Sequence, residues 1–138
     1  MADAVNTQTI ENGPRNLVMK FTNISDGTGE SAVVKVDAST FAPALTTSLK
    51  VKKIEYNVTG GAVNLLWDAT TDVPFAYLTG YGCIDLEDTQ GIVNSAGSGV
   101  TGDILFTTSG FNAANGTSPT ATPASGYTII LYMIKGNV

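Results

Sequence analysis

Apolar residues in this chain recur at every second position, and this alternation constrains the fold more than any other feature of the sequence. A period of two is typical of a β-strand, whereas a helix needs a period of about 3.6. The alternating runs are 17–24, 31–37, 49–67, 75–86, 103–108 and 127–135. They predict an all-β fold, an antiparallel, jelly-roll-like β-sandwich of about seven or eight strands joined by Gly-rich turns.

Turn residues predict which strands are neighbours. Asp26-Gly27-Thr28-Gly29 stands between 17–24 and 31–37, so these two runs are expected to form a hairpin. Gly60-Gly61 supplies the residues of a two-residue turn, and a second hairpin is therefore expected within 49–67. Its register would form three apolar cross-strand pairs, namely Val58 with Val63, Tyr56 with Leu65, and Ile54 with Trp67.

The alternation changes phase at one point within 49–67. Leu49 and Val51 would point away from the face of Ile54, and one extra residue at Lys52-Lys53 restores a single apolar face. A β-bulge is therefore expected there. In 31–37, Val34 and Val36 alternate with Lys35 and Asp37, so the two valines share one face of the expected strand.

The last strand, 127–135, is apolar on both faces. Its two sets of alternate residues are Tyr127, Ile129, Leu131 and Met133 on one side and Ile130, Tyr132 and Ile134 on the other. Such a strand in an antiparallel protein needs cover on its second side. The cover is either the chain's own N-terminal arm or a neighbouring subunit, and the neighbour is favoured. Interface contacts are therefore expected at Ile130, Tyr132 and Ile134.

Residues 1–15 are expected to form an N-terminal arm on a single β-sandwich domain of residues 16–138. The arm is polar and ends at Gly13-Pro14. A free tail and an extended arm that adds to the sheet edge of a neighbour fit this composition equally well. The residues that would contact the neighbour in the second case are Val5, Thr7, Thr9 and Ile10.

The residue types present argue against enzymatic activity. The chain has no histidine, which removes His-dependent triads, imidazole metal sites and the usual general base near neutral pH. Its one cysteine, Cys83, stands in an apolar stretch and is expected to be a buried small hydrophobe. We expect no catalytic residues and no cofactor.

Charge and hydropathy exclude two kinds of partner. The formal net charge is −5, and the one basic cluster, Lys50, Lys52 and Lys53, is expected to be a solvated strand face rather than a nucleic-acid site. No apolar stretch approaches the length of a membrane span, about 18 residues. Neither nucleic acid nor a membrane is expected as a partner.

Two groups of side chains remain as candidate ligand sites. Asp85, Glu87 and Asp88, with Asp103 as a further ligand, would offer oxygen atoms to Ca²⁺. Their spacing matches no specific calcium loop, so solvated or turn-forming acids are favoured and no metal is expected. The second group would form an aromatic platform for sugars and contains Tyr56, Trp67, Tyr77, Tyr81, Tyr127 and Tyr132. Tyr56 and Trp67 fall on the apolar face of the expected hairpin, which favours core packing for these two.

Four segments resemble small virion proteins of tailed phages. They are 53–68 (KIEYNVTGGAVNLLWD), 78–86 (LTGYGCIDL), 102–110 (GDILFTTSG) and 127–135 (YTIILYMIK). The resemblance implies a capsid decoration (cement) protein, a β-sandwich on the outer capsid surface that binds at capsomer junctions and stabilises the shell. It also implies the major capsid protein as partner and a homo-oligomer, with a trimer favoured.

Two other functions stay open from the sequence. A glycan- or host-binding module of a phage head or tail fibre would use Tyr77, Tyr81 or the segment 109–126. That segment is expected to be a long surface loop, because Pro119 and Pro123 exclude a central strand. A minor tail or adaptor subunit is the third function, and its position in the virion would separate it from the other two.

Overall fold

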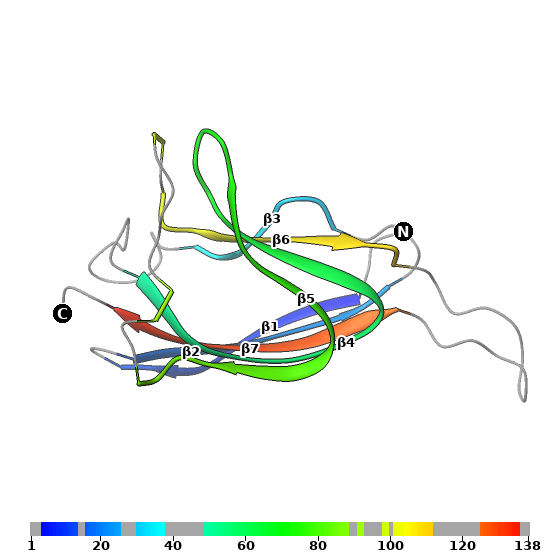
Figure 1. Ribbon diagram of the computed structural model, residues 1–138, viewed down its shortest axis with the longest axis horizontal. Coiled ribbons are helices and arrows are strands. Elements are labelled where there is room, and N and C mark those ends of the chain that lie inside the picture. Colours follow the sequence, from blue (N-terminus) through cyan, green and yellow to red (C-terminus); the bar gives the residue numbers. More distant parts are fainter. Residues whose placement is uncertain are drawn as a thin grey trace, which may run out of the picture.

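Seven β-strands form the described part of the chain, and the expected all-β, antiparallel fold is confirmed. The computed structural model describes residues 4–13, 16–25, 30–37, 49–88, 91–92, 98–99, 101–111 and 125–135. The strands are β1 (Ala4–Asn12), β2 (Asn16–Ile24), β3 (Val33–Val36), β4 (Leu49–Trp67), β5 (Val73–Asp85), β6 (Ile104–Ser109) and β7 (Gly126–Lys135). They form one sheet that is nearly closed into a barrel (Figure 1). Most of the expected loop 109–126, residues 112–124, lies outside the described residues.

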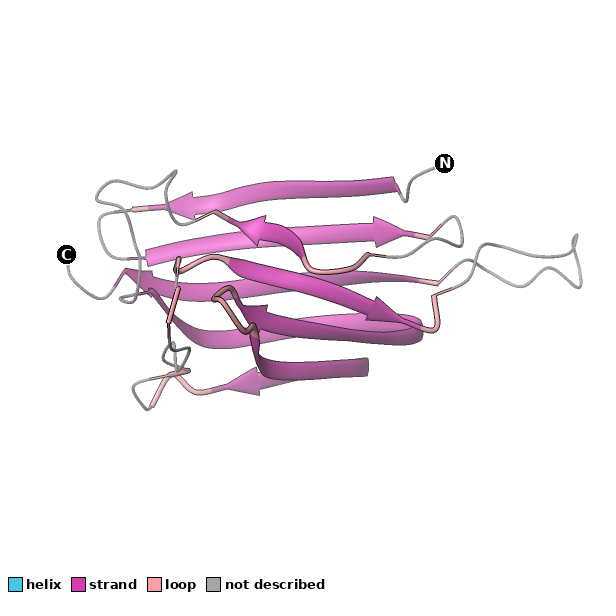
Figure 2. Cartoon of the chain, turned by 90° about the horizontal axis from the view of Figure 1, so that it is seen from above, coloured by secondary structure: helices cyan, strands magenta, loops and turns pink. Residues whose placement is uncertain are grey.

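The sheet folds into two layers because β4 and β5 are long enough to belong to both. The five-stranded layer contains β1, β2, β7, residues 49–59 of β4 and residues 80–85 of β5. The other layer contains β3, β6, residues 62–67 of β4 and residues 73–79 of β5. Figure 1 shows β3 and β6 above the first layer, and Figure 2 shows strands of both layers running along the long axis. The two layers of the expected sandwich are therefore parts of one continuous sheet.

β4 passes through Gly60 and Gly61 without reversing, so the hairpin expected within 49–67 is wrong. Val58 pairs with Gly80 and Ala62 with Thr79, which leaves residues 59–61 as an insertion relative to β5. Gly60 and Gly80 have φ angles of 74° and 72°. One left-handed residue in each strand bends the pair as a bulge does, and the strand crosses from one layer to the other. A Cβ on Gly61 would stand 2.5 Å from the Ser109 carbonyl oxygen, which explains the second glycine.

The hairpin expected between the runs 17–24 and 31–37 is also wrong. β2 pairs with β1 and β7, whereas β3 pairs with β6 in the other layer. The register of β3 shifts between Val34 and Val36, and this shift breaks the alternation. As a result Val36 is buried whereas Val34 is 47% exposed, so the two valines do not share one face as the alternation indicated.

The β-bulge expected at Lys52-Lys53 is confirmed. Val51 pairs with Met133 and Lys53 with Tyr132, so Lys52 is the extra residue. Its carbonyl oxygen accepts the Leu86 N–H at 2.8 Å. The bulge brings both halves of the alternating pattern onto the core, where Leu49, Val51 and Ile54 are all buried.

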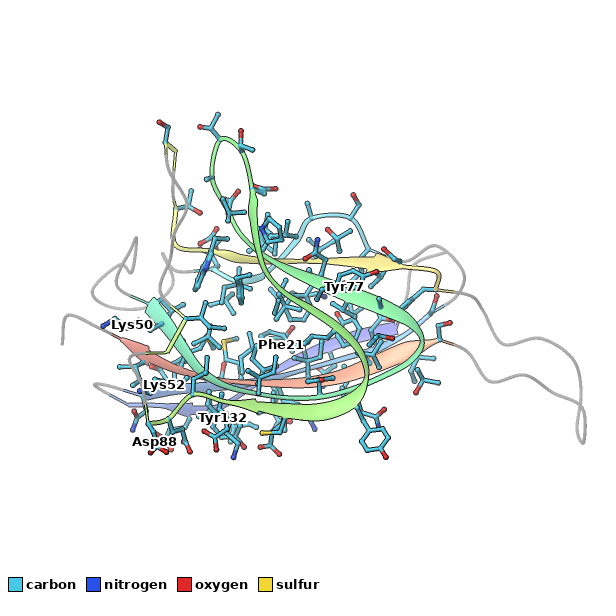
Figure 3. All side chains as sticks on the ribbon, viewed as in Figure 1. Phe21, Lys50, Lys52, Tyr77, Asp88 and Tyr132 are labelled. Atoms are coloured by element: carbon cyan, nitrogen blue, oxygen red, sulfur yellow. The ribbon has the colours of Figure 1, made fainter. Side chains whose placement is uncertain are left out.

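Aromatic side chains hold the two layers together. The ring centroid of Phe106 lies 5.1 Å from that of Phe21 and 5.6 Å from that of Tyr127, in edge-to-face geometry. Trp67 stacks on Phe75 with 4.5 Å between centroids. Phe21 is seen between the layers in Figure 3. Because Phe106 belongs to β6 and its two partners to β2 and β7, these contacts join the layers across the core.

A buried ion pair adds a polar link between the layers. Lys35 Nζ lies 2.5 Å from Glu30 Oε2, and the two side chains are 5% and 6% exposed. Glu30 Oε1 accepts the Tyr127 hydroxyl at 2.6 Å. The Glu30 N–H donates to Thr108 Oγ1 at 2.7 Å, and the Thr108 N–H donates to the Glu30 carbonyl at 2.9 Å. The pair therefore connects β3 with β6 and with β7 of the opposite layer.

Candidate functional site

One side of the five-stranded layer packs on the core, and the other side points away from β3 and β6; we name the latter the outer face. In Figure 3, Tyr132 projects from this face, on the opposite side of the layer from Phe21. Two rows of register partners cross it, Gln8, Lys20, Ile130, Glu55 and Cys83 in one, and Glu11, Val18, Tyr132, Lys53 and Asp85 in the next. β7 thus places an apolar side chain in the middle of each row, with charged groups around it.

The two-faced character of β7 is confirmed. Its core-facing residues, represented by Ile129 and Leu131, are at most 4% exposed. On the outer face Ile130, Tyr132 and Ile134 are half-buried. Long lysine and glutamate side chains of β2 and β4 flank them and supply part of that cover. No labelled strand lies on this side of the layer in Figure 1.

The N-terminal residues lie beside this row and not over it. The segment expected as a free tail or as an arm on a neighbour forms, from Ala4 to Asn12, strand β1 of the chain's own sheet. The side chains of residues 5–12 are all exposed, with Val5 at 50% and Ile10 at 53%. The residues predicted as interface contacts therefore form two groups, one at the margin of the sheet and one at the centre of the outer face.

Tyr132 makes the best-defined polar contact of the outer face. Its hydroxyl donates to Glu55 Oε1 at 2.5 Å, and Lys53 Nζ lies 5.2 Å from the centroid of its ring. The hydrogen bond to Glu55 raises the pKa of Tyr132 above its ordinary value, and partial burial raises it further. The physical cause is that loss of the phenol proton would place two negative charges side by side.

We predict that Glu55→Gln lowers the pKa of Tyr132 toward the ordinary tyrosine value. The folded-state pKa is raised, so the stability that this contact contributes is present below the unfolded-state pKa and is lost as pH rises through the folded-state pKa. The measurement is an alkaline titration of tyrosinate absorbance, with Tyr132→Phe identifying the component that belongs to Tyr132. A Tyr132 component that titrates identically in Glu55→Gln would contradict the assigned cause.

Hollows border the apolar row at both ends. One of about 600 Å³ lies between Ile130, Asn57 and Tyr81. Another of about 480 Å³ lies beside Tyr132 and Ile134. The outer face is therefore a row of half-buried apolar side chains between two recesses that protruding side chains of a partner can enter.

No family model, no curated protein and no solved structure matches this chain. Within the described ranges no helix has the length and apolar character that a membrane crossing requires.

The tyrosines do not form one aromatic platform, because the corner at Gly80 separates Tyr77 from Tyr81. Tyr77 pairs with Asn64 in one layer, and Tyr81 pairs with Asn57 in the other. Both rings are exposed, at 65% and 84% respectively. As expected, Trp67 is buried and Tyr56 packs partly buried against the core; Tyr127 is buried as well. Tyr56 and Tyr81 line one hollow of the outer face, and Tyr132 lines the other.

The acidic candidates do not gather into a metal site in the part of the chain that the structure describes. No group of three Asp, Glu or Cys side chains in these ranges is arranged to hold an ion. Asp85 Oδ1 instead accepts the Glu87 N–H at 3.0 Å, which forms a turn. Asp88 follows in that turn, and Asp103 lies elsewhere, where its carbonyl accepts the Asp68 N–H at 3.0 Å.

Cys83 is exposed, so the expectation that it is buried is wrong. It lies opposite Glu55 on β5, a strand that pairs with β4 alone in the described sheet. Its neighbour Ile84 takes the core-facing position instead. The signal that would have found this is the alternation itself, because adjacent residues of a strand point to opposite faces.

The register also adds two outer-face residues that the sequence did not single out as contacts. Val18 of β2 and Lys53 of β4 are the cross-strand partners of Tyr132. Both positions follow from the strand order β2-β7-β4, which joins segments far apart in the chain. No local pattern in the sequence carries that order.

Proposed function

We propose that this chain is a non-enzymatic structural protein of a tailed-phage virion, a capsid decoration protein that binds the outer shell through its outer face. One observation carries the proposal: Ile130, Tyr132 and Ile134 lie half-buried at the centre of a broad sheet and are surrounded by charged side chains. An apolar centre with a polar rim is the usual composition of a protein–protein interface. The resemblance of the four segments supplies the partner class, the major capsid protein.

The surrounding charges would set the orientation of docking. Lys20 of β2 flanks the apolar row on one side. Lys53 and Glu55 of β4 flank it on the other. Charges of both signs fix the register of a partner and exclude partners with like charges at those positions. Several copies on a symmetric shell would bind by avidity, so no single contact has to be strong. The proposal includes a homo-oligomer, and it requires no cofactor, nucleic acid or membrane.

The test uses capsid shells of a tailed phage that carries this chain, stripped of it and incubated with the purified protein. We expect Ile130→Thr/Ile134→Thr to weaken binding to the shells by about tenfold or more, because apolar side chains at the centre of an interface dominate its energy. Co-sedimentation with the shells measures the binding.

A matched control is available in the other layer. Val33 and Val34 of β3 are 38% and 47% exposed, so Val33→Thr/Val34→Thr removes similar apolar groups from a different surface. This variant should bind shells as the unmodified chain does. Equal binding by both variants, or a position of the chain inside the shell or in the tail, would overturn the proposal. A tail position would instead identify a minor tail or adaptor subunit.

A second candidate function is glycan binding, which the exposure of Tyr81 favours. Its ring is 84% exposed and borders the same hollow as Asn57 and Glu55. An open aromatic ring beside amide and carboxylate groups suits a sugar, which stacks one apolar face and hydrogen-bonds with its hydroxyl groups. Glycan-array binding that Tyr81→Ala abolishes and Tyr77→Ala leaves intact, together with no binding to shells, would support this function over the first.

A further inference from the structure

β1 is an edge strand whose outer side is unpaired in the described sheet. It stands at the end of the strand order and pairs only with β2. In Figure 2, β1 is the strand next to the N mark, at one margin of the molecule. Both faces of the strand are accessible, since the side chains of residues 5–12 are all exposed. The N–H and C=O groups of residues 5–9 that point away from β2 are therefore open to another strand.

β1 lacks the devices that usually protect such an edge. Natural edge strands are kept from pairing by lysine, proline, shortness or bulges. β1 is nine residues long, contains neither lysine nor proline, and has its one register shift near the end, between Thr9 and Glu11. Its only charged side chain is Glu11. Residues 4–9 thus offer a regular, uncharged stretch of backbone.

The other edges of the described sheet are protected. β3 is four residues long and has a register shift. β5 contains Pro74 and is bent at Gly80. β1 therefore differs from the edge strands β3 and β5. An unprotected edge promotes uncontrolled association unless a specific strand covers it, so the difference favours a partner strand that binds to β1.

We propose that β1 pairs antiparallel with β1 of a second copy of this chain, about a two-fold axis at Thr7. In this register Thr7 of each copy faces Thr7 of the other on the core-side face, and Val5 faces Thr9. On the outer face Asn6 faces Gln8, and their amide groups can exchange hydrogen bonds. Threonine pairs and β-branched pairs are favourable across antiparallel strands, and no like charges meet between residues 5 and 9.

The pairing joins the two five-stranded layers into one continuous sheet. The axis is perpendicular to the sheet, so both outer faces point the same way and two apolar rows of β7 are presented side by side. Two linked copies bind a repetitive surface more tightly than one copy does. This consequence deepens the proposed function, but the pairing itself requires no shell and is tested without one.

The first experiment measures mass in solution by light scattering coupled to size-exclusion chromatography. We expect a dimer of 28.6 kDa, twice the chain mass of 14.3 kDa. Thr7→Lys should give a monomer, because the axis brings two like charges into contact. The matched control is Thr71→Lys, at an exposed position between β4 and β5, which should remain a dimer. A monomer or a trimer of the unmodified chain, or a dimer of Thr7→Lys, would overturn the proposal.

A charge-swap experiment separates lost pairing from lost folding. Thr7→Glu should also be a monomer on its own, and an equimolar mixture of Thr7→Glu and Thr7→Lys should restore the dimer. Only an axis at residue 7 makes these two substitutions direct partners. If the mixture stays monomeric while both variants unfold as the unmodified chain does, this register is wrong. Because no shell is present, failure here leaves the shell-binding test of the outer face standing.

Discussion

Lys35→Met is expected to lower the free energy of unfolding by about 3–5 kcal/mol. The substitution keeps most of the side-chain volume but leaves the Glu30 carboxylate, 6% exposed, without its counter-charge. The hydrogen bond from the Tyr127 hydroxyl to Glu30 remains, but a hydroxyl does not neutralise a buried charge. The loss should be measured by urea denaturation at neutral pH.

Two variants make this prediction specific. Lys50 of β4 lies on the outer face, at the left end of the molecule in Figure 3. Lys50→Met should change the free energy of unfolding by less than about 0.5 kcal/mol. Glu30→Gln in the Lys35→Met background should recover most of the loss, because glutamine still accepts from Tyr127 and leaves no unpaired charge. If Lys35→Met and Lys50→Met are equally stable, the ion pair does not hold the layers together.

Trp67→Ala is expected to lower the free energy of unfolding by about 3–5 kcal/mol. Trp67 is 0% exposed and stacks on Phe75 with 4.5 Å between ring centroids. Its removal leaves a cavity at the point where β4 lies between β5 and β6. Because Trp67 is the only tryptophan, unfolding should be followed by circular dichroism and not by tryptophan fluorescence.

Two further variants separate the loss of the buried aromatic ring of Trp67 from the loss of its indole N–H and from the loss of an exposed ring. Trp67→Phe should cost less, about 1–2 kcal/mol, because it keeps an aromatic ring against Phe75. It also deletes the indole N–H, which is buried with no hydrogen-bond partner among the described residues. Tyr77→Ala removes a comparable ring that is 65% exposed and should change stability by less than about 0.5 kcal/mol. Similar losses in Trp67→Ala and Tyr77→Ala would contradict the assigned core position.

Alternation predicted what is local in this fold. It identified the all-β class, the bulge at Lys52 and the two faces of β7, since each depends only on which side a residue of a strand points to. It failed where the chain departs from a regular strand. The shift at Lys35 turns Val34 outward, and the bend at Gly60 carries β4 onward where a reversal was expected.

Strand pairing could not be predicted for a different reason. Neighbours in the sequence were expected to be neighbours in the sheet, but β2 pairs with β7 and β3 with β6, over long sequence separations. Such pairings depend on how whole layers pack. The same holds for the candidate site: Tyr132 was singled out from the sequence, whereas its contacts with Glu55 and Lys53 follow from β4 lying beside β7.

The corner of β4 and β5 has a consequence for how the molecule responds to force and heat. In a sandwich of two separate sheets, one sheet can slide or melt away from the other by breaking side-chain packing alone. Here β4 passes from one layer into the other with its hydrogen-bonded partner β5 on both sides of the bend. Loss of the side-chain packing therefore leaves the layers joined at the bend by the backbones of both strands, and a load applied to either layer is carried into the other through covalent backbone.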